Sequence, residues 1–217
     1  MGRKSIAVGL VISAAAVAGC GSSSHASSSA SSSHAAPPSG PPASRTGLEA
    51  KVLMPGELHG FNVAEPTTAT NPQAWAAVDQ FPAGQRSATV GRLRRLGFTG
   101  GAREDLTWAA PNAAGSTTPP AAGLSVVEQF RTPAAARGEL TAELPTLGPG
   151  AAIKVRGVPG ARGYSSTGGG QDFADVLFAS GPDLYLVGAE WQTSLKRKLS
   201  LQELVAAVQH EYQRTHQ

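Results

Sequence analysis

The chain of 217 residues contains a single cysteine, Cys20. Without a second thiol it forms no internal disulfide, so its core has to be held by packing alone. Aromatic residues are sparse, at 6% of the chain, whereas glycine and proline occur 26 and 16 times. After a long stretch rich in serine and alanine, about 170 residues remain, which is enough for one domain with a buried core.

Long hydrophobic runs and a strong charge of one sign are also missing. No run of about 18 consecutive apolar residues occurs, so no conventional membrane-spanning helix is expected. The formal net charge is +3, from 18 basic and 15 acidic side chains, and two of the basic residues, Arg3 and Lys4, lie at the extreme N-terminus. Without those two the chain is almost neutral, so we expect no nucleic acid partner.

The signatures of common enzymes are absent as well. There is no His-Glu-x-x-His and no Ser-x-x-Lys with Lys-Thr-Gly, which argues against a zinc protease and a penicillin-binding enzyme. Ser165 stands in a glycine-rich setting, Gly163-Tyr-Ser-Ser-Thr167, but the final glycine of a nucleophile elbow is missing. The glycines at 168–170 precede neither a lysine nor a predicted helix, so they indicate a turn. We expect no cofactor and no metal, and assign no catalytic residue.

Carboxylates leave one enzymatic alternative open. A hydrolase or transferase acting on envelope polymers requires two acidic side chains that meet across a substrate. The candidates are Glu104, Asp105, Glu128, Asp172, Asp175 and Glu190. Their spacing does not decide whether any two meet, so solvated strand residues and a catalytic pair both remain open.

The N-terminus carries the most informative pattern. Arg3 and Lys4 precede an apolar run from Ile6 to Ala18, and small residues lead into the thiol in Val17-Ala-Gly-Cys20. The run is about a dozen residues, too short for a hydrocarbon core that needs roughly 20. This arrangement resembles the signal peptide and lipobox of bacterial lipoproteins.

That resemblance implies removal of residues 1–19 and acylation of Cys20, by palmitate or a similar chain. Two acyl chains suffice for stable attachment to a bilayer. We therefore expect a lipid anchor that holds the protein on the outer face of the cell membrane, which makes the membrane its first partner.

Residues 20–46 are predicted to be a disordered linker that begins with the lipidated cysteine. From Gly21 to Ser44 the chain is almost wholly Ser, Ala, Gly and Pro, which bury too little apolar surface to fold. His25 and His34 lie nine positions apart in this stretch and make no convincing metal site.

Residues 47–217 are predicted to form one extracytoplasmic α+β domain, with an antiparallel sheet packed against helices. Helices are expected from Asn71-Pro72, over Arg86–Leu96 with a stop at Gly97, from Thr132-Pro133 to Pro145, and after Ser200. Strands are expected over 124–130, 172–179 and 184–191, with a surface loop over 109–123. Short turns between the later strands favour antiparallel pairing.

The C-terminal third carries the sharpest local signals. Residues 180–183 connect two strand-like runs that are apolar on both faces, so the centre of the sheet should be covered on both sides. Ser200-Leu-Gln-Glu203 is a capping box with Leu199 and Leu204 as its hydrophobic staple. The helix that follows is predicted to bury Leu201, Leu204, Val205, Val208 and Tyr212.

Two groups of basic residues stand out, Arg92/Arg94/Arg95 and Lys196/Arg197/Lys198. On a protein tethered to an anionic leaflet they are candidates for contact with headgroups or cell-wall phosphates. Charged, solvated faces are the alternative interpretation.

Several stretches resemble a group of uncharacterised actinobacterial cell-envelope lipoproteins: Met54–Phe61, Arg92–Phe98, Leu124–Arg137, Val158–Tyr164 and Leu184–Gly188. The expected fold is loosely similar to the LpqN and PsbP-like envelope domains. Neither resemblance implies an activity or a catalytic residue. We therefore expect a non-enzymatic module that binds an envelope ligand or protein, through residues that the sequence does not identify. An apolar groove with Tyr164, Tyr185 or Trp191 at its mouth would favour this over the enzymatic alternative.

Overall fold

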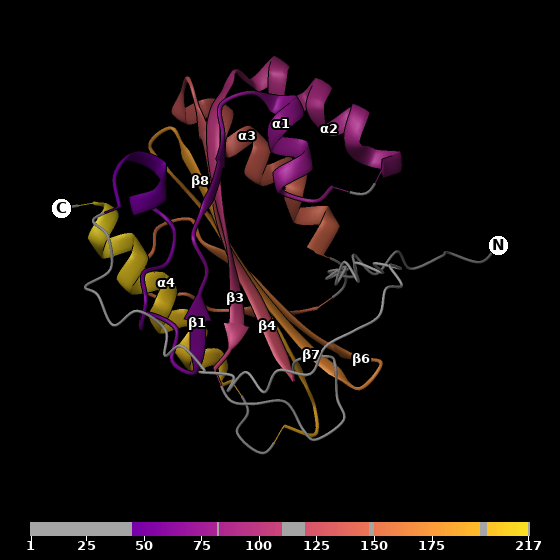
Figure 1. The fold of residues 1–217 in the computed structure, drawn as a ribbon, viewed down its shortest axis with the longest axis vertical. Coiled ribbons are helices and arrows are strands. Elements are labelled where there is room, and N and C mark those ends of the chain that lie inside the picture. Colours follow the sequence, from indigo (N-terminus) through magenta and orange to yellow (C-terminus); the bar gives the residue numbers. More distant parts are fainter. Residues whose placement is uncertain (1–44, 82, 110–119, 148–149, 196–198, 217) are drawn as a thin grey trace, which may run out of the picture.

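The computed structural model describes residues 45–81, 83–109, 120–147, 150–195 and 199–216. Within these residues a single antiparallel sheet of eight strands is covered by helices on both faces, as Figure 1 shows. The chain therefore has the predicted α+β fold. Cys20, the rest of the leader, and the histidines at 25 and 34 lie outside the described residues.

The strands follow the order β1-β3-β4-β8-β7-β6-β5 across the sheet, and β2 also pairs with β3. Their bounds are β1 Phe61–Val63, β2 Thr67–Ala69, β3 Phe98–Trp108, β4 Ala121–Phe130, β5 Ala151–Ile153, β6 Arg162–Gly168, β7 Gln171–Ser180 and β8 Asp183–Gln192. The helices are α1 Pro72–Val78, α2 Ala83–Leu96, α3 Pro133–Glu143 and α4 Leu201–Thr215, with 3-10 turns at Gly47–Ala50 and Leu144–Leu147.

Two hydrophobic clusters lie on opposite faces of this sheet. We call α1, α2 and α3 the helix layer; it packs on one face around Trp75, Leu93 and Phe130. Helix α4 packs on the other face around Val187, Leu204 and Val208. The prediction that the centre of the sheet is covered on both sides is thus confirmed.

Strand β4 shows why the central strands are apolar at consecutive positions. Val126 and Phe130 belong to the cluster under the helix layer, whereas Val127 belongs to the cluster under α4. Because successive side chains of a strand point to opposite faces, a strand covered on both sides loses the usual apolar–polar alternation.

The predicted helix ends are confirmed by their hydrogen bonds. The side chain of Asn71 caps α1 by accepting from the Ala74 amide, and Thr132 caps α3 by accepting from the Ala135 amide. Ser200 and Glu203 form the predicted capping box of α4. Gly97 ends α2 with φ +73°, a left-handed conformation that favours glycine.

Three details differ from the sequence-based expectations. Ser180 pairs directly with Asp183, so the turn between β7 and β8 has Gly181-Pro182 at its tip instead of a four-residue connection. Residues 121–123 belong to β4 and not to a loop. Leu201 is 38% exposed and lines a surface hollow; the buried residues of α4 begin at Leu204.

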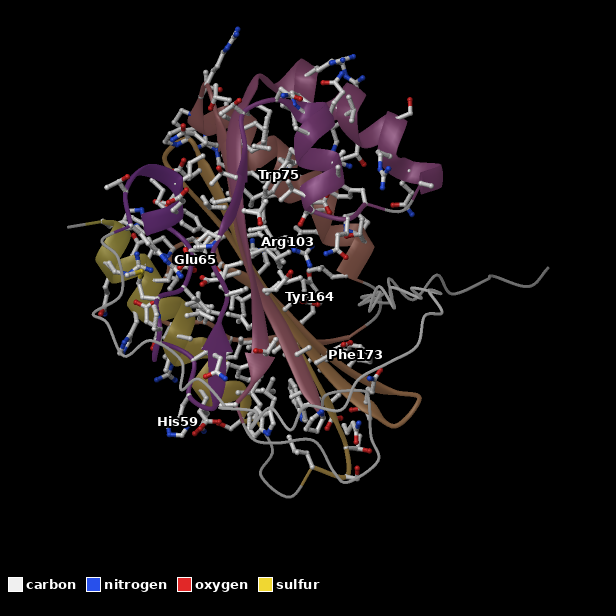
Figure 2. The ribbon with its side chains drawn as sticks, viewed as in Figure 1. His59, Glu65, Trp75, Arg103, Tyr164 and Phe173 are labelled. Carbon is white, nitrogen blue, oxygen red and sulfur yellow. The ribbon has the colours of Figure 1, made fainter. Side chains whose placement is uncertain are left out.

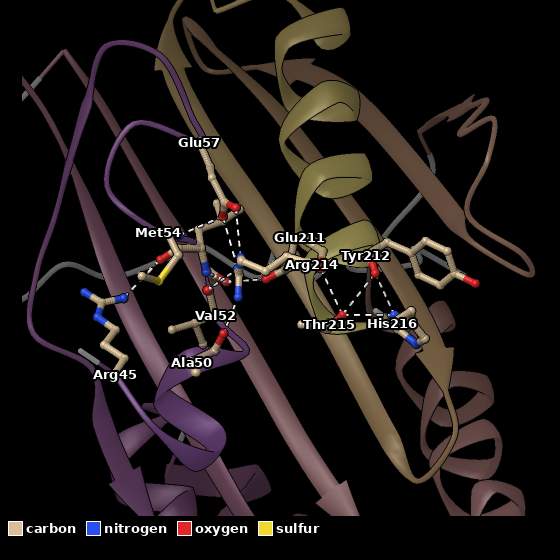
Figure 3. Close-up of polar contacts among 12 residues, drawn as sticks. Arg45, Ala50, Val52, Met54, Glu57, Glu211, Tyr212, Arg214, Thr215 and His216 are labelled. Carbon is tan, nitrogen blue, oxygen red and sulfur yellow. Dashed lines mark hydrogen bonds and ion pairs between the residues drawn. The ribbon is translucent and has the colours of Figure 1, made fainter.

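The last turn of α4 fastens the segment that enters the domain. The Arg214 guanidinium donates to the carbonyls of Ala50 and Val52 and forms an ion pair with Glu57, as Figure 3 shows. The chain ends of the domain are therefore held together by one arginine, which ties the first residues of the fold to its last helix.

Arg45 lies within the range predicted as linker, yet it is fixed to the sheet. Its guanidinium makes two hydrogen bonds, of 2.7 and 3.1 Å, to the buried Glu104 carboxylate. It also donates to the carbonyls of Leu53 and Ala64. Arg45 is therefore part of the folded domain. The several donors of its guanidinium match a carboxylate and nearby carbonyls.

Candidate functional site

The register of the sheet brings two carboxylates and two aromatic rings onto one face. Tyr164 of β6 lies directly opposite Asp175 of β7, and Phe173 of β7 lies opposite Glu190 of β8. Residues that pair directly share a face, and so do residues two apart along a strand. The two carboxylates are therefore diagonal neighbours, and so are the two rings. We call these four residues the acid–aromatic patch.

The patch lies on the same side of the sheet as the helix layer. Asp175 pairs with Gly188, Gly188 pairs with Leu124, and Leu124 belongs to the cluster under that layer. In Figure 2, Tyr164 and Phe173 lie on the lower half of the sheet, away from Trp75 among the helices. All four side chains of the patch are half-buried.

Gly188 makes room for the Asp175 side chain. A Cβ atom at position 188 would collide with Oδ1 of Asp175. The Asp175 carboxylate therefore lies over the backbone of β8, on the face of the sheet that carries Glu190. A side chain at position 188 would displace it, so the glycine is part of the geometry of the patch.

The electrostatics of this pair differ from those of the other candidate carboxylates. Burial, helped by the nearby charge of Glu190, raises the pKa of Asp175 to about 6. Burial also raises the pKa of Glu190. Within the described residues no arginine or lysine acts to lower either pKa. Two carboxylates held close without a cation hold a proton more strongly than an isolated acid does.

The remaining candidates have partners of their own or point elsewhere. Glu104 is bound by Arg45, and Asp105 by Arg103 at 2.8 and 2.9 Å. Glu128 accepts from the Trp75 indole N–H at 2.6 Å. Asp172 accepts from Thr167 and pairs with Trp191, which places it on the opposite face from Asp175. Of the six carboxylates, Asp175 and Glu190 form the pair that the sequence left undecided.

A second group of acids lies between the helix layer and the sheet. We call Asp79, Glu128, Glu139 and Glu143 the buried acid cluster; Arg92 and Arg103 are its cations. Arg92 binds Glu139 and Glu143, and Arg103 binds Asp79 as well as Asp105. Burial raises the pKa of Asp79 and of Glu139 to about 7, and that of Glu128 well above its ordinary value.

This cluster joins several elements. Its acids come from the end of α1, from α3 and from β4, and its arginines from α2 and β3. One oxygen of Glu139 has no hydrogen-bond partner, although the residue is fully buried. More acids than cations in a buried layer favour protonated carboxylates, so the cluster ties the layer to the sheet in a way that depends on pH.

The other predicted residues fall in different places. Tyr185 and Trp191 are buried in the core under α4, so they do not stand at the mouth of a site. Arg92 is not part of a basic surface, because its guanidinium forms ion pairs with Glu139 and Glu143. Arg94 and Arg95 are exposed. Lys196, Arg197 and Lys198 lie outside the described residues.

Sequence reasoning missed Phe173, Gly188 and the inward acids of the helix layer. Phe173 stands in a predicted strand, and counting back from the turn at Gly181-Pro182 would have placed it opposite Glu190. No comparable signal predicts that Trp75 meets Glu128, because these residues come from elements 53 positions apart.

Two surface hollows lie away from the patch. One, of about 340 Å³, is lined by Ile153, Lys154, Leu201, Gln202, Val205 and Gln209. The other, of about 320 Å³, lies where α4 meets the entering segment and is lined by Gly47, Ala50, Lys51, Met54, Arg214 and Thr215. Neither hollow contains an acidic side chain, so neither has the carboxylate pair that envelope-polymer hydrolysis requires.

In the part of the chain that the structure describes, no three or more His, Cys, Asp or Glu side chains are grouped so as to hold a metal ion. No helix among those residues has the length and apolar character needed to cross a membrane.

Comparison with known proteins finds similarity in solved structures alone. No family model matches the chain, and no curated protein sequence matches it. The extracellular domain of PknH from Mycobacterium tuberculosis has a TM-score of 0.49 at 12% identity, covering 78% of this chain and 95% of that domain. An uncharacterized protein from Mycobacterium smegmatis, the Rv0999 ortholog, has a TM-score of 0.39 at 9% identity, covering 72% and 89%.

Proposed function

We propose that this protein is a lipid-anchored, extracytoplasmic binding module of the cell envelope, and that the acid–aromatic patch is its ligand site. The anchor is supported by the sequence around Cys20. The site is supported by one observation above the others: Asp175 and Glu190 are a half-buried carboxylate pair, and no cation among the described residues lowers the pKa of either.

The chemistry of the patch favours a positively charged organic ligand. A cation supplies the countercharge that the pair lacks, which removes part of the cost of holding two carboxylates together. The faces of Tyr164 and Phe173 attract a cation through their ring quadrupoles, and quaternary ammonium groups are recognised in this way. A group with a charged nitrogen and apolar substituents matches both features.

Choline and its neutral isostere 3,3-dimethyl-1-butanol are suitable probes for this site. We expect choline to shift the NMR signals of residues 164, 173, 175 and 190, and the neutral alcohol to leave them in place. Asp175→Asn should weaken choline binding by about tenfold, because one charge-assisted contact is worth about 1.4 kcal/mol. Binding should tighten as the pH rises through about 6, where Asp175 loses its proton.

Asp172→Asn is the matched control, since it removes the same charge from the same strand on the opposite face of the sheet. It should leave choline binding unchanged. Equal shifts with the neutral alcohol, or equal weakening by the two Asp→Asn variants, would contradict a cationic ligand at this patch.

The enzymatic alternative uses the same two carboxylates. A hydrolase or transferase of envelope polymers would need one of them protonated and the other ionised, and the raised pKa of Asp175 allows this near neutral pH. Release of reducing ends from purified cell walls by the wild-type chain, and its loss in Glu190→Gln, would favour that alternative over a binding module.

The lipid anchor is tested by substitution of Cys20. Cys20→Ala should leave the precursor unprocessed and without acyl chains, because in bacterial lipoproteins acylation of the thiol precedes cleavage. Mass spectrometry of the protein purified from its membrane checks this. The wild-type chain should begin at an acylated Cys20, and a mature N-terminus at any other residue would contradict the proposal.

A further inference from the structure

The acids of the helix layer face inward, whereas most of its arginines, Arg92 excepted, are exposed. Helix α2 has no acidic residue, and the acids of α3 are directed to Arg92. Glu139 is fully buried, whereas Arg94, Arg95, Arg131 and Arg137 are exposed. The outer surface of these two helices is therefore positive, although the chain as a whole is nearly neutral.

These four exposed arginines, which we call the arginine patch, lie where α2 ends and α3 begins. The Arg131 amide donates to the Gly97 carbonyl at 3.0 Å, so Arg131 lies next to the end of the helix that carries Arg94 and Arg95. A Cβ atom on Gly138 would lie 3.4 Å from the Leu96 side chain. This short approach places α3 beside the end of α2, and Arg137 is the exposed residue that precedes Gly138.

Most of the arginine patch is available for an external anion. Arg94 faces the Gln73 side chain, and no hydrogen bond or ion pair to an acidic side chain was found for the patch within the described residues. Guanidinium groups bind phosphate through two parallel hydrogen bonds, and several of them on one surface attract an anionic interface. The chemistry of the patch thus matches a phosphate-bearing surface.

We propose that the arginine patch docks the domain on the anionic phospholipid headgroups of the membrane that carries its anchor. The choice of a bilayer rests on the proposed function, because the lipid site at Cys20 is only some two dozen residues before Arg45. The composition of that stretch predicts a flexible linker, for which an r.m.s. reach of roughly 25–30 Å is expected, and this would keep the domain close to the headgroups. A lipid chain together with a basic surface is a common pair of membrane signals.

Vesicle sedimentation of the mature chain without its acylated cysteine, residues 21–217, tests the docking apart from the anchor. The vesicles contain phosphatidylcholine, with or without phosphatidylglycerol. We expect binding to the anionic vesicles alone, and its loss at high salt because the interaction is electrostatic. The triple variant Arg95→Gln, Arg131→Gln, Arg137→Gln should lower partitioning by at least about tenfold, since each basic residue near an anionic surface contributes about fivefold.

The matched control removes three exposed charges at the β5–β6 edge of the sheet, in Lys154→Gln, Arg156→Gln, Arg162→Gln. This variant should lose less than about twofold, because charges beyond a Debye length of about 10 Å from the lipid are screened. Circular dichroism of both variants checks that they are folded.

Three outcomes would overturn the proposal: no binding to the anionic vesicles, equal losses in the two triple variants, or binding to soluble polyphosphate without binding to vesicles. The last would identify a soluble phosphate polymer as the partner. Residues 21–217 carry no lipid, so a failure of vesicle binding does not bear on the acylation of Cys20. That acylation is tested separately, by mass spectrometry of the mature N-terminus.

Discussion

Lowering the pH from about 8 to about 5 should stabilise this protein, in contrast to the usual behaviour of proteins whose carboxylates are held by salt bridges. Asp79 and Glu139 have their pKa raised to about 7 and Glu128 has its pKa raised further, in each case mainly by burial. At pH 5 to 7 the folded state therefore holds protons that the unfolded chain has released. The free energy of unfolding then falls as the pH rises through this window and beyond about 7.

The expected size is roughly 3 kcal/mol, less than the separate shifts would give at about 1.4 kcal/mol per pKa unit, because the acids titrate as a coupled group. For a domain of this size it corresponds to a melting temperature about 6–12 °C higher at pH 5 than at pH 8. Thermal unfolding followed by circular dichroism across this pH range measures it.

Glu128→Gln serves as the control for this pH effect. The amide keeps an oxygen to accept from Trp75 but has no charge to lose, so the dependence of the melting temperature on pH should become shallower. A wild-type melting temperature that rises toward pH 8 would contradict the protonated state of the cluster.

Trp75→Ala should destabilise the protein by about 3–5 kcal/mol, the range for removing a large buried aromatic side chain. Trp75 is fully buried, and its ring stacks on Phe98 with centroids 5.9 Å apart. The ring also lies on Gly101, where a Cβ atom would approach it to 2.8 Å. The substitution removes this packing and leaves the Glu128 carboxyl without its indole donor. The midpoint of denaturant unfolding measures the loss.

Trp75→Phe separates packing from hydrogen bonding. It keeps an aromatic ring over Gly101 but removes the N–H that Glu128 accepts, so we expect a cost of about 1–3 kcal/mol for the unsatisfied group. Trp75→Phe should therefore lower the free energy of unfolding by less than Trp75→Ala does. If Trp75→Ala costs less than about 1 kcal/mol, the helix layer is not held to the sheet through this residue.

Local chemistry made several features of this fold predictable. The caps at Asn71, Thr132 and Ser200 depend on a side chain and an amide three residues apart, so neighbouring residues contain all the necessary information. The left-handed stop at Gly97 is local in the same way. The α+β class followed because apolar spacing and turn residues indicate element types before any contact between elements is known.

The acid–aromatic patch could be predicted from the sequence only in part. Asp175 and Glu190 were both candidates, and the β7–β8 hairpin fixes their register through its turn. Packing decided which face they share with the helix layer, and that no cation among the described residues lowers their pKa. Likewise Tyr185 and Trp191 were placed in the core by α4, whose position on the sheet no local pattern specifies.

By itself, the sequence determined the helix caps, the stop at Gly97 and the expectation of a lipid anchor at Cys20, because each depends on residues close together in the chain. The tertiary structure alone decided that Arg45 meets Glu104, that Trp75 meets Glu128, and that the acids of α3 meet Arg92 while the other arginines beside them are exposed. These contacts join residues far apart in the chain, and each forms only when the sheet order β3-β4-β8-β7 and the helices packed on it bring the partners together.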